Sequence, residues 1–182
     1  MFKKVLICFC LLSSFVLAQD VIQIGIKYNE ASARIEAFDG IIKKIDKDFY
    51  RDFLVDKNKE ENIKNIKSGN FKLMGRELCP FYIKNTLATY AVSYDDMPFT
   101  TFYYNILGKL IKFDIMQNQT YPIKTYGYSR YGNLISVGFD VDDREQFVYD
   151  ENGKLKAHWI DDEALNKDND SFKVFKIKRG LK

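Results

Sequence analysis

The sequence predicts an α+β protein in which an N-terminal helical segment is followed by an antiparallel β-meander built of hairpin repeats. Apolar residues recur at helical spacing up to Gly69. After Gly69, short runs rich in Phe, Tyr, Ile, Val and Thr alternate with Gly, Asn and Asp. A pattern of Tyr, three residues, Gly, one residue and Leu then occurs three times. The 182 residues, 46% of them hydrophobic, are sufficient for one folded unit over residues 19–182.

Residues 1–18 have the layout of a secretory signal peptide. Lys3 and Lys4 form a basic start, residues 5–17 are apolar apart from two serines, and Val16 and Ala18 are compact residues at the positions that a signal peptidase reads. We therefore expect cleavage after Ala18 and export to the periplasm, the medium or the cell surface. A retained signal anchor is the alternative, although the apolar run is short for a membrane span.

Removal of the signal peptide changes the cysteine count and the charge. Cys8 and Cys10 leave with it, so the mature chain keeps only Cys79 and forms no internal disulfide. The loss of Lys3 and Lys4 lowers the formal net charge from +3 to about +1. This charge gives no global basic field for a nucleic-acid partner, and the mature chain contains no expected transmembrane segment.

Residues 19–69 are expected to hold a short strand and a helical segment. Residues 19–27 alternate isoleucine with polar or small residues, which favours a strand. Asn29 can cap a short helix that reaches Phe38 and ends at Asp39 and Gly40.

Residues 41–54 show the clearest helical spacing. This predicts an amphipathic helix, which either lies on a membrane surface or a partner, or packs on the sheet that follows. We favour packing, because an apolar stripe in a globular chain usually faces its core. Residues 56–62 fit a loop or a solvated helix, after which Ile63 and Ile66 resume the pattern until residues 68–70 stop it. The apolar side of the predicted helix comprises Ile41, Ile42, Ile45, Phe49, Phe53 and Leu54.

Residues 70–182 are expected to form the β-region. A short run at 71–74 ends at Gly75, and the runs 81–83 and 87–92 flank a turn at 84–86, which indicates a hairpin. Residues 171–182 alternate apolar residues with lysine. They fit a terminal strand protected from aggregation, and the alternative is a basic strand that meets a phosphate-rich surface.

The three repeat units span residues 104–110, 128–134 and 149–155, with starts 24 and 21 residues apart. We interpret each unit as a type I turn followed by a glycine in the left-handed conformation, which forms a bulge and restarts the strand. The Leu then points to the face that carries the Tyr. Such hairpins joined in series form a meander that no single unit could stabilise alone.

The third unit reads Y-D-E-N-G-K-L and resembles the YD repeats of Rhs-type surface proteins. It is also similar to the YwqK/MORN-like hairpin repeats of bacteria. Tyr149, Asp150, Gly153 and Leu155 match fully, and the second unit has Ser129 in place of Asp. The resemblance covers about a third of the chain. It implies a β-rich scaffold or interaction surface and supplies no set of catalytic residues.

Five residues are candidates for binding. We expect Tyr104, Tyr128, Tyr149 and Trp159 to form a row of exposed aromatics near the turns, which could stack on sugars or peptides of the cell envelope. The alternative is that the row packs within the sheet. His158, the chain's single histidine, lies beside its single tryptophan and joins the candidates.

The residues that could support catalysis or bind metal are few. A Cys79–His158 nucleophile pair is arithmetically possible, but Cys79 lies in an apolar run that is typical of a buried thiol. The acidic groups at 140–145 and 161–170 lack the spacing of a calcium loop, so they fit solvated loops better. We therefore predict no catalytic residue, metal or cofactor, and a non-enzymatic interaction or scaffold protein. A small secreted hydrolase acting on envelope material is the alternative.

Overall fold

The structure is a computed structural model that describes residues 28–161, 163–165 and 171–172. Its strands form one antiparallel sheet in which each strand pairs with the next along the chain, which confirms the predicted meander. The strands are β1 (Lys72–Leu73), β2 (Arg76–Ile83), β3 (Thr86–Tyr94), β4 (Thr100–Asn105), β5 (Leu110–Met116), β6 (Ile123–Ser129), β7 (Leu134–Asp140), β8 (Glu145–Asp150), β9 (Leu155–Ile160), β10 (Glu163–Leu165) and β11 (Ser171–Phe172).

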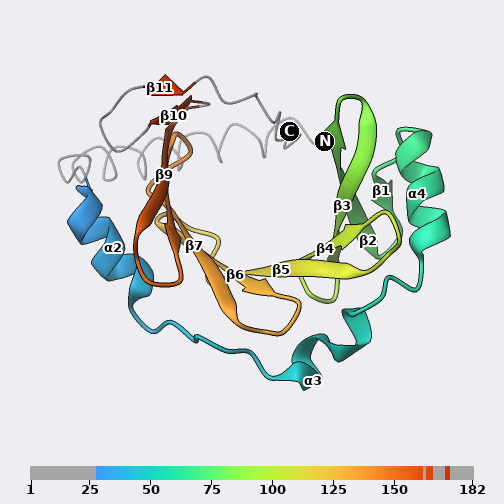
Figure 1. Cartoon of the computed structure of the whole chain (residues 1–182), viewed down its shortest axis with the longest axis horizontal. Coiled ribbons are helices and arrows are strands. Elements are labelled where there is room, and N and C mark those ends of the chain that lie inside the picture. Colours follow the sequence, from blue (N-terminus) through green and yellow to red (C-terminus); the bar gives the residue numbers. More distant parts are fainter. Residues whose placement is uncertain (1–27, 162, 166–170, 173–182) are drawn as a thin grey trace, which may run out of the picture.

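The helices precede the sheet in the chain and lie outside its curve. Figure 1 shows β3 and β9 rising on opposite sides of the central strands, with the helices on the outer side. We call the side of the sheet that meets the helices the outer face, and the opposite side the inner face. The helices are α2 (Glu30–Phe38), α3 (Lys47–Tyr50), the 3₁₀ turn η1 (Arg51–Phe53) and α4 (Lys59–Lys67).

Helix α2 forms where the sequence predicts it, and α4 shows that residues 59–62, which fit either a loop or a helix, are helical. The Asn29 side chain accepts a hydrogen bond from the Ser32 amide at 2.9 Å, and this caps α2. Gly40, with φ of +70°, then allows the chain to leave the helix. Helix α4 buries Ile66 and ends at Ser68, as the apolar spacing and the stop signal indicate.

The predicted helix at 41–54 is wrong over half of its length, because only α3 and η1, residues 47–53, are helical within it. The stretch before α3 is held extended by the turn of the second repeat unit, between β6 and β7. The Ile45 amide donates to the Gly132 carbonyl at 2.8 Å, and the Leu134 amide donates to the Lys43 carbonyl at 2.8 Å. Bonds of this kind supply the partners that helix formation would otherwise provide, so tertiary contacts override the local preference.

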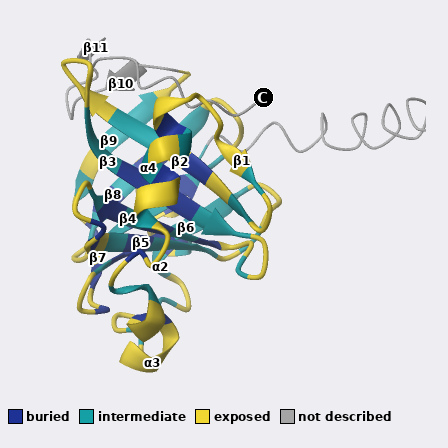
Figure 2. Cartoon of the chain, turned by 90° about the vertical axis from the view of Figure 1, so that its right-hand side faces the viewer, coloured by how far each residue is buried: buried dark blue, intermediate teal, exposed yellow. Residues whose placement is uncertain are grey.

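The short helical turns that remain bring two aromatic rings onto the sheet. Phe53 stacks on Phe102 with ring centroids 4.2 Å apart, and Tyr50 stacks on Phe113 at 5.0 Å. Figure 2 shows α3 projecting below the sheet with most of its residues exposed. The apolar stripe therefore does face the core in part, although Phe49 and Ile42 stay exposed.

The repeat turns have the predicted conformation. Gly108, Gly132 and Gly153 have φ of +71°, +77° and +80°, and the register shifts by one residue next to each repeat tyrosine. The residue after each tyrosine supplies an oxygen that accepts two backbone amides of the turn, as Asp150 does from Asn152 and Lys154 at 3.0 Å each. Asn105 and Ser129 do the same in the first two units, which explains why Ser129 can replace Asp.

The N-terminal segment runs along these turns in reverse order. A Cβ on Gly153 would lie 3.4 Å from Arg34 of α2, one on Gly132 would lie 2.5 Å from the Ile45 carbonyl, and one on Gly108 would lie 3.0 Å from Lys59 of α4. The segment therefore meets the third unit first and the first unit last. Gly132 therefore has a second function, because the backbone of the segment approaches it too closely for a Cβ.

The core lies between the outer face and this segment. Residues opposite each other in the sheet share a face, and the outer-face rows are almost entirely apolar. Ala33 and Ala37 of α2 and Ile66 of α4 close the core from the other side. The fully buried large side chains of the outer face are Tyr90, Val92, Phe102, Tyr104, Phe113, Tyr126, Tyr128, Val137, Phe139 and Tyr149.

Three of the predicted segments fall outside the described residues. These are the signal peptide at 1–18, the strand at 19–27 and the end of the basic terminal strand at 173–182. In the part of the chain that the structure describes, no helix is long and apolar enough to cross a membrane.

Candidate functional site

The expected row of exposed aromatics at the turns is contradicted by the structure. Tyr104, Tyr128 and Tyr149 are 0%, 1% and 0% exposed and cannot present a binding surface. The bulge keeps each tyrosine on the same face as the leucine of its unit, and the N-terminal segment covers that face. These residues are therefore packing residues of the core.

Two of the three tyrosines anchor the N-terminal segment through their hydroxyl groups. Tyr128 donates to the Ile42 carbonyl at 2.9 Å, and Tyr149 donates to the Glu30 carbonyl at 3.2 Å. Burial raises the pKa of Tyr128 to about 12. The hydroxyl of Tyr104 is also buried, and it makes no hydrogen bond of normal geometry, although the hydroxyl of Tyr94 lies close enough to interact with it.

His158 and Trp159 are adjacent in sequence but lie on opposite faces of the sheet. His158 lies on the outer face, where its Nε2 is 2.8 Å from a carboxylate oxygen of Glu145 and its ring stacks on Phe147 at 4.2 Å. Trp159 lies opposite Gln146 on the inner face and is partly exposed. The two residues therefore do not form one site, and His158 has the partners of a packed histidine.

Cys79 and His158 are not brought together either. Cys79 lies on the inner face of β2, whereas His158 lies on the outer face of β9. Cys79 is exposed, which corrects the expectation of a buried thiol. Partial desolvation and then the nearby carboxylate of Glu77 raise the pKa of the thiol, which disfavours the reactive thiolate.

The acidic residues before the third unit stabilise their own loop. Asp142 accepts hydrogen bonds from the amides of Arg144 and Glu145 at 2.8 Å each. Arg144 in turn pairs with both oxygens of Asp161 at 2.6 and 2.9 Å. Within residues 28–161 and the described parts of the last strands, no group of three or more His, Cys, Asp or Glu side chains could hold a metal.

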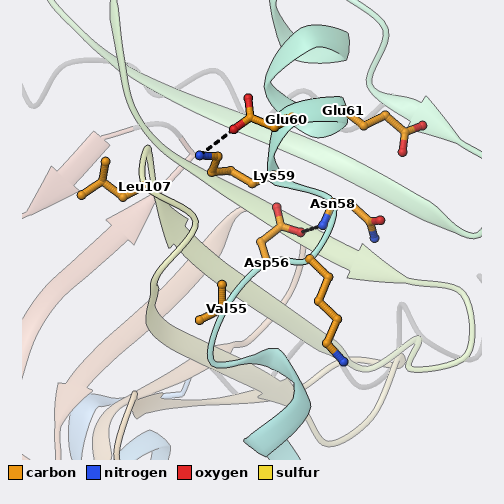
Figure 3. Close-up of a pocket in the computed structure, with 8 residues that line it drawn as sticks. Val55, Asp56, Asn58, Lys59, Glu60, Glu61 and Leu107 are labelled. Carbon is orange, nitrogen blue, oxygen red and sulfur yellow. Dashed lines mark hydrogen bonds and ion pairs between the residues drawn. The ribbon is translucent and has the colours of Figure 1, made fainter.

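A pocket of about 410 Å³ opens between α4 and the turn of the first repeat unit, between β4 and β5 (Figure 3). Asp56 lies at its inner edge and is buried, although it is a carboxylate. It accepts hydrogen bonds from the amide of Asn58, the side chain of Asn62 and the hydroxyl of Tyr90, at 2.9, 2.9 and 2.6 Å. Burial and this bond to the carboxylate raise the pKa of Tyr90.

Most charges around this pocket are satisfied by one another. Lys59 pairs with Glu60 at 2.7 Å, and Glu61 pairs with Arg76 at 2.7 Å. Asp56 is fully engaged in joining α4 to the sheet, because a buried carboxylate requires such partners. The arrangement is best explained as a polar joint that holds α4 in place.

The inner face of the sheet has a different composition from the core face. A row of residues in direct register crosses six strands, from β3 to β8, and each of its side chains is polar except for one glycine. No described helix packs on this face. Three partly exposed aromatic residues, Phe81, Tyr103 and Trp159, share it with the row. The polar row is Ser93, Thr101, Asp114, Gly127, Ser136 and Asp150.

The centre of the row is narrow and polar. A Cβ on Gly127 would lie 2.2 Å from the Ser136 hydroxyl and 3.0 Å from a carboxylate oxygen of Asp114, so both side chains lean over the glycine. Lys112 binds both oxygens of Asp114 at 3.0 Å and lies 4.2 Å from the ring centre of Tyr103. The site therefore combines fixed hydrogen-bonding groups with an aromatic ring.

Sequence reasoning missed this face, although two signals pointed to it. Gly127 and Gly138 lie inside strands, where a glycine often marks a close approach of another group. In β5 the polar residues Lys112 and Asp114 alternate with apolar ones, which predicts a second, polar face. The turn motif drew attention to the outer face instead.

Comparison of the chain with protein-family models, curated proteins and solved structures finds no match.

Proposed function

We propose that the protein is an exported, non-enzymatic binding module of the bacterial envelope, and that the inner face of its sheet binds glycan. The observation that carries the proposal is the contrast between the two faces. The outer face is buried under the N-terminal segment, while the inner face is polar, partly exposed and left open by the described helices.

Sugars match the chemistry of the inner face. Their hydroxyl groups need fixed donors and acceptors, and Thr101, Asp114 and Ser136 supply both kinds. Their C–H faces pack on aromatic rings, which Tyr103 and Trp159 provide from two strands. A curved sheet holds these groups on regular backbone, so little ordering is needed when a ligand binds.

Two sequence features support export and the absence of enzymatic activity. The first 18 residues have the composition of a signal peptide. The repeat resembles YD and MORN-like hairpins, whose families are scaffolds or interaction surfaces. We include in the proposal that the chain is related to one of these repeat families. The alternative of a small hydrolase has the His158–Glu145 contact as its best support, and these two residues line neither of the two pockets described in this structure.

The test is binding of the mature protein, residues 19–182, to a panel of neutral and acidic oligosaccharides. Asp114→Asn and Tyr103→Leu should weaken binding because they remove an acceptor charge and a ring from the inner face. The matched control is Tyr82→Leu, which removes an exposed tyrosine from the end of β2, where it lies in register with the core-packed Leu87 and lines neither pocket.

Loss of binding in the inner-face variants with no loss in the control supports the proposal. Equal binding by all four proteins, or no binding to any sugar, would overturn it. New reducing ends in the reaction would instead favour the hydrolase, and His158→Gln would then show whether that contact is involved.

A further inference from the structure

A second pocket, of about 590 Å³, lies between the N-terminal segment and the turn of the second repeat unit. Its volume falls within the range usual for small-ligand sites. It is on the outer side of the molecule and shares no residue with the inner face. The pocket is lined by Lys44, Ile45, Asp46, Lys47, Tyr50, Leu54, Arg130 and Tyr131.

The charges of this pocket are predominantly positive and unpaired. Lys44, Lys47 and Arg130 make no ion pair with any described carboxylate, so their charges are not neutralised within the described chain. Asp46 is the one acid in the lining, and its carboxylate already accepts the Asp48 amide at 2.8 Å. The pocket around α4 is the opposite case, because Lys59 there is neutralised by Glu60.

The backbone beneath these cations is held in place. Lys44 pairs with Asn133 in an isolated β-bridge, and the Ile45 amide donates to the Gly132 carbonyl at 2.8 Å. The Arg130 amide donates to the Ile111 carbonyl at 3.2 Å. The three cations therefore project from fixed backbone on two segments that are far apart in sequence.

The repeat explains how the site could arise without disturbing the fold. In each unit the tyrosine, its oxygen-bearing neighbour, the glycine and the leucine determine the turn, and the two residues before the glycine are unconstrained. The second unit has Arg130 and Tyr131 at these positions, with the Arg130 guanidinium 5.4 Å from the Tyr131 ring. The first unit has Ile106 and Leu107 there, and neither is charged.

We propose that this pocket binds a phosphate group carried by a larger ligand. The planar guanidinium of Arg130 can donate two parallel hydrogen bonds to phosphate oxygens, and Lys44 and Lys47 add two point charges. The ring of Tyr131, 67% exposed, can pack against the part of the ligand that carries the phosphate.

The test is a titration of the mature protein with inorganic phosphate and with glycerol phosphate, followed by calorimetry and by NMR. A second arm measures binding to vesicles of phosphatidylcholine with and without phosphatidylglycerol, which separates a soluble phosphate from a lipid headgroup. The test variant is Lys47→Gln with Arg130→Gln. The control is Lys64→Gln with Lys67→Gln, which removes the same charge from exposed positions on α4.

Removal of the two pocket cations should weaken phosphate binding at least about tenfold, because each charged hydrogen bond contributes appreciably. The control should bind as the unchanged protein does, and both variants should keep its thermal midpoint. Selective loss in either the soluble or the vesicle arm supports the site and identifies the source of the phosphate. Absence of binding in both arms, or equal loss in test and control variants, would overturn the proposal.

Discussion

Tyr104 and Tyr128 occupy the same position of the hairpin repeat, yet their replacement by phenylalanine should change stability in opposite directions. Both side chains are buried on the outer face. Tyr128 donates a hydrogen bond to the Ile42 carbonyl at 2.9 Å, whereas the Tyr104 hydroxyl makes no hydrogen bond of normal geometry and has only the Tyr94 hydroxyl near it. The two substitutions remove the same atom from the same motif, so each serves as the control for the other.

The expected magnitudes follow from these partners. Tyr128→Phe loses one hydrogen bond and should lower the free energy of unfolding by about 1 kcal/mol. Tyr104→Phe removes a hydroxyl that was desolvated with no hydrogen bond of normal geometry in return, and should raise the free energy of unfolding by roughly 1 kcal/mol. The two variants should therefore differ by about 2 kcal/mol.

The assay is equilibrium unfolding in urea, followed by far-UV circular dichroism and by fluorescence. Coinciding transitions and an unchanged slope with urea are needed before the free energies can be compared. If Tyr104→Phe destabilises the protein as much as Tyr128→Phe, the Tyr104 hydroxyl has an effective partner, such as the Tyr94 hydroxyl or a buried water, and the reasoning fails.

Three further predictions concern other parts of the fold. Gly132→Ala should lower the free energy of unfolding in urea by at least about 2 kcal/mol more than Gly75→Ala does. Both glycines have positive φ, but only at Gly132 would a Cβ meet a backbone carbonyl. Equal losses would contradict a rigid contact. Stability should fall as the pH rises from about 10 to about 12, because the pKa of Tyr128 is raised from 10.0 to about 12 by folding and the unfolded chain therefore loses the proton first; a denaturation midpoint that is constant over this window would refute it. Cys79 should react with iodoacetamide at pH 8 several-fold more slowly than glutathione, because the pKa of its thiol is raised; reaction at an equal rate would show that the thiolate is not disfavoured.

The hairpins could be predicted in detail because their determinants are local. A glycine is required where φ is positive, and an oxygen-bearing residue is required where two turn amides need an acceptor. Both requirements are met within seven residues of one unit, as in residues 149–155. Asn29 and Gly40 define the ends of α2 for the same reason.

The stretch 41–54 could not be predicted in this way. Its apolar spacing favours a helix, but the edge of a hairpin turn offers hydrogen bonds to an extended backbone, and these contacts come from residues nearly ninety positions away. The N-terminal segment to which this stretch belongs covers the repeat tyrosines, as Ile42 does for Tyr128 and α2 does for Tyr149; the sequence alone could place these tyrosines near a turn but not under a covering segment.

The candidate binding surfaces also separate into features set by neighbouring residues and features set by tertiary packing. The turns, the strand alternation and the order of the meander can be predicted from the sequence, because each depends on neighbours within a few residues. Which face of the sheet is covered is visible only in the folded chain, since it depends on where the N-terminal segment packs. That packing hides Tyr104, Tyr128 and Tyr149, leaves Asp114 and its neighbours on an open inner face, and brings Lys44 beside Arg130.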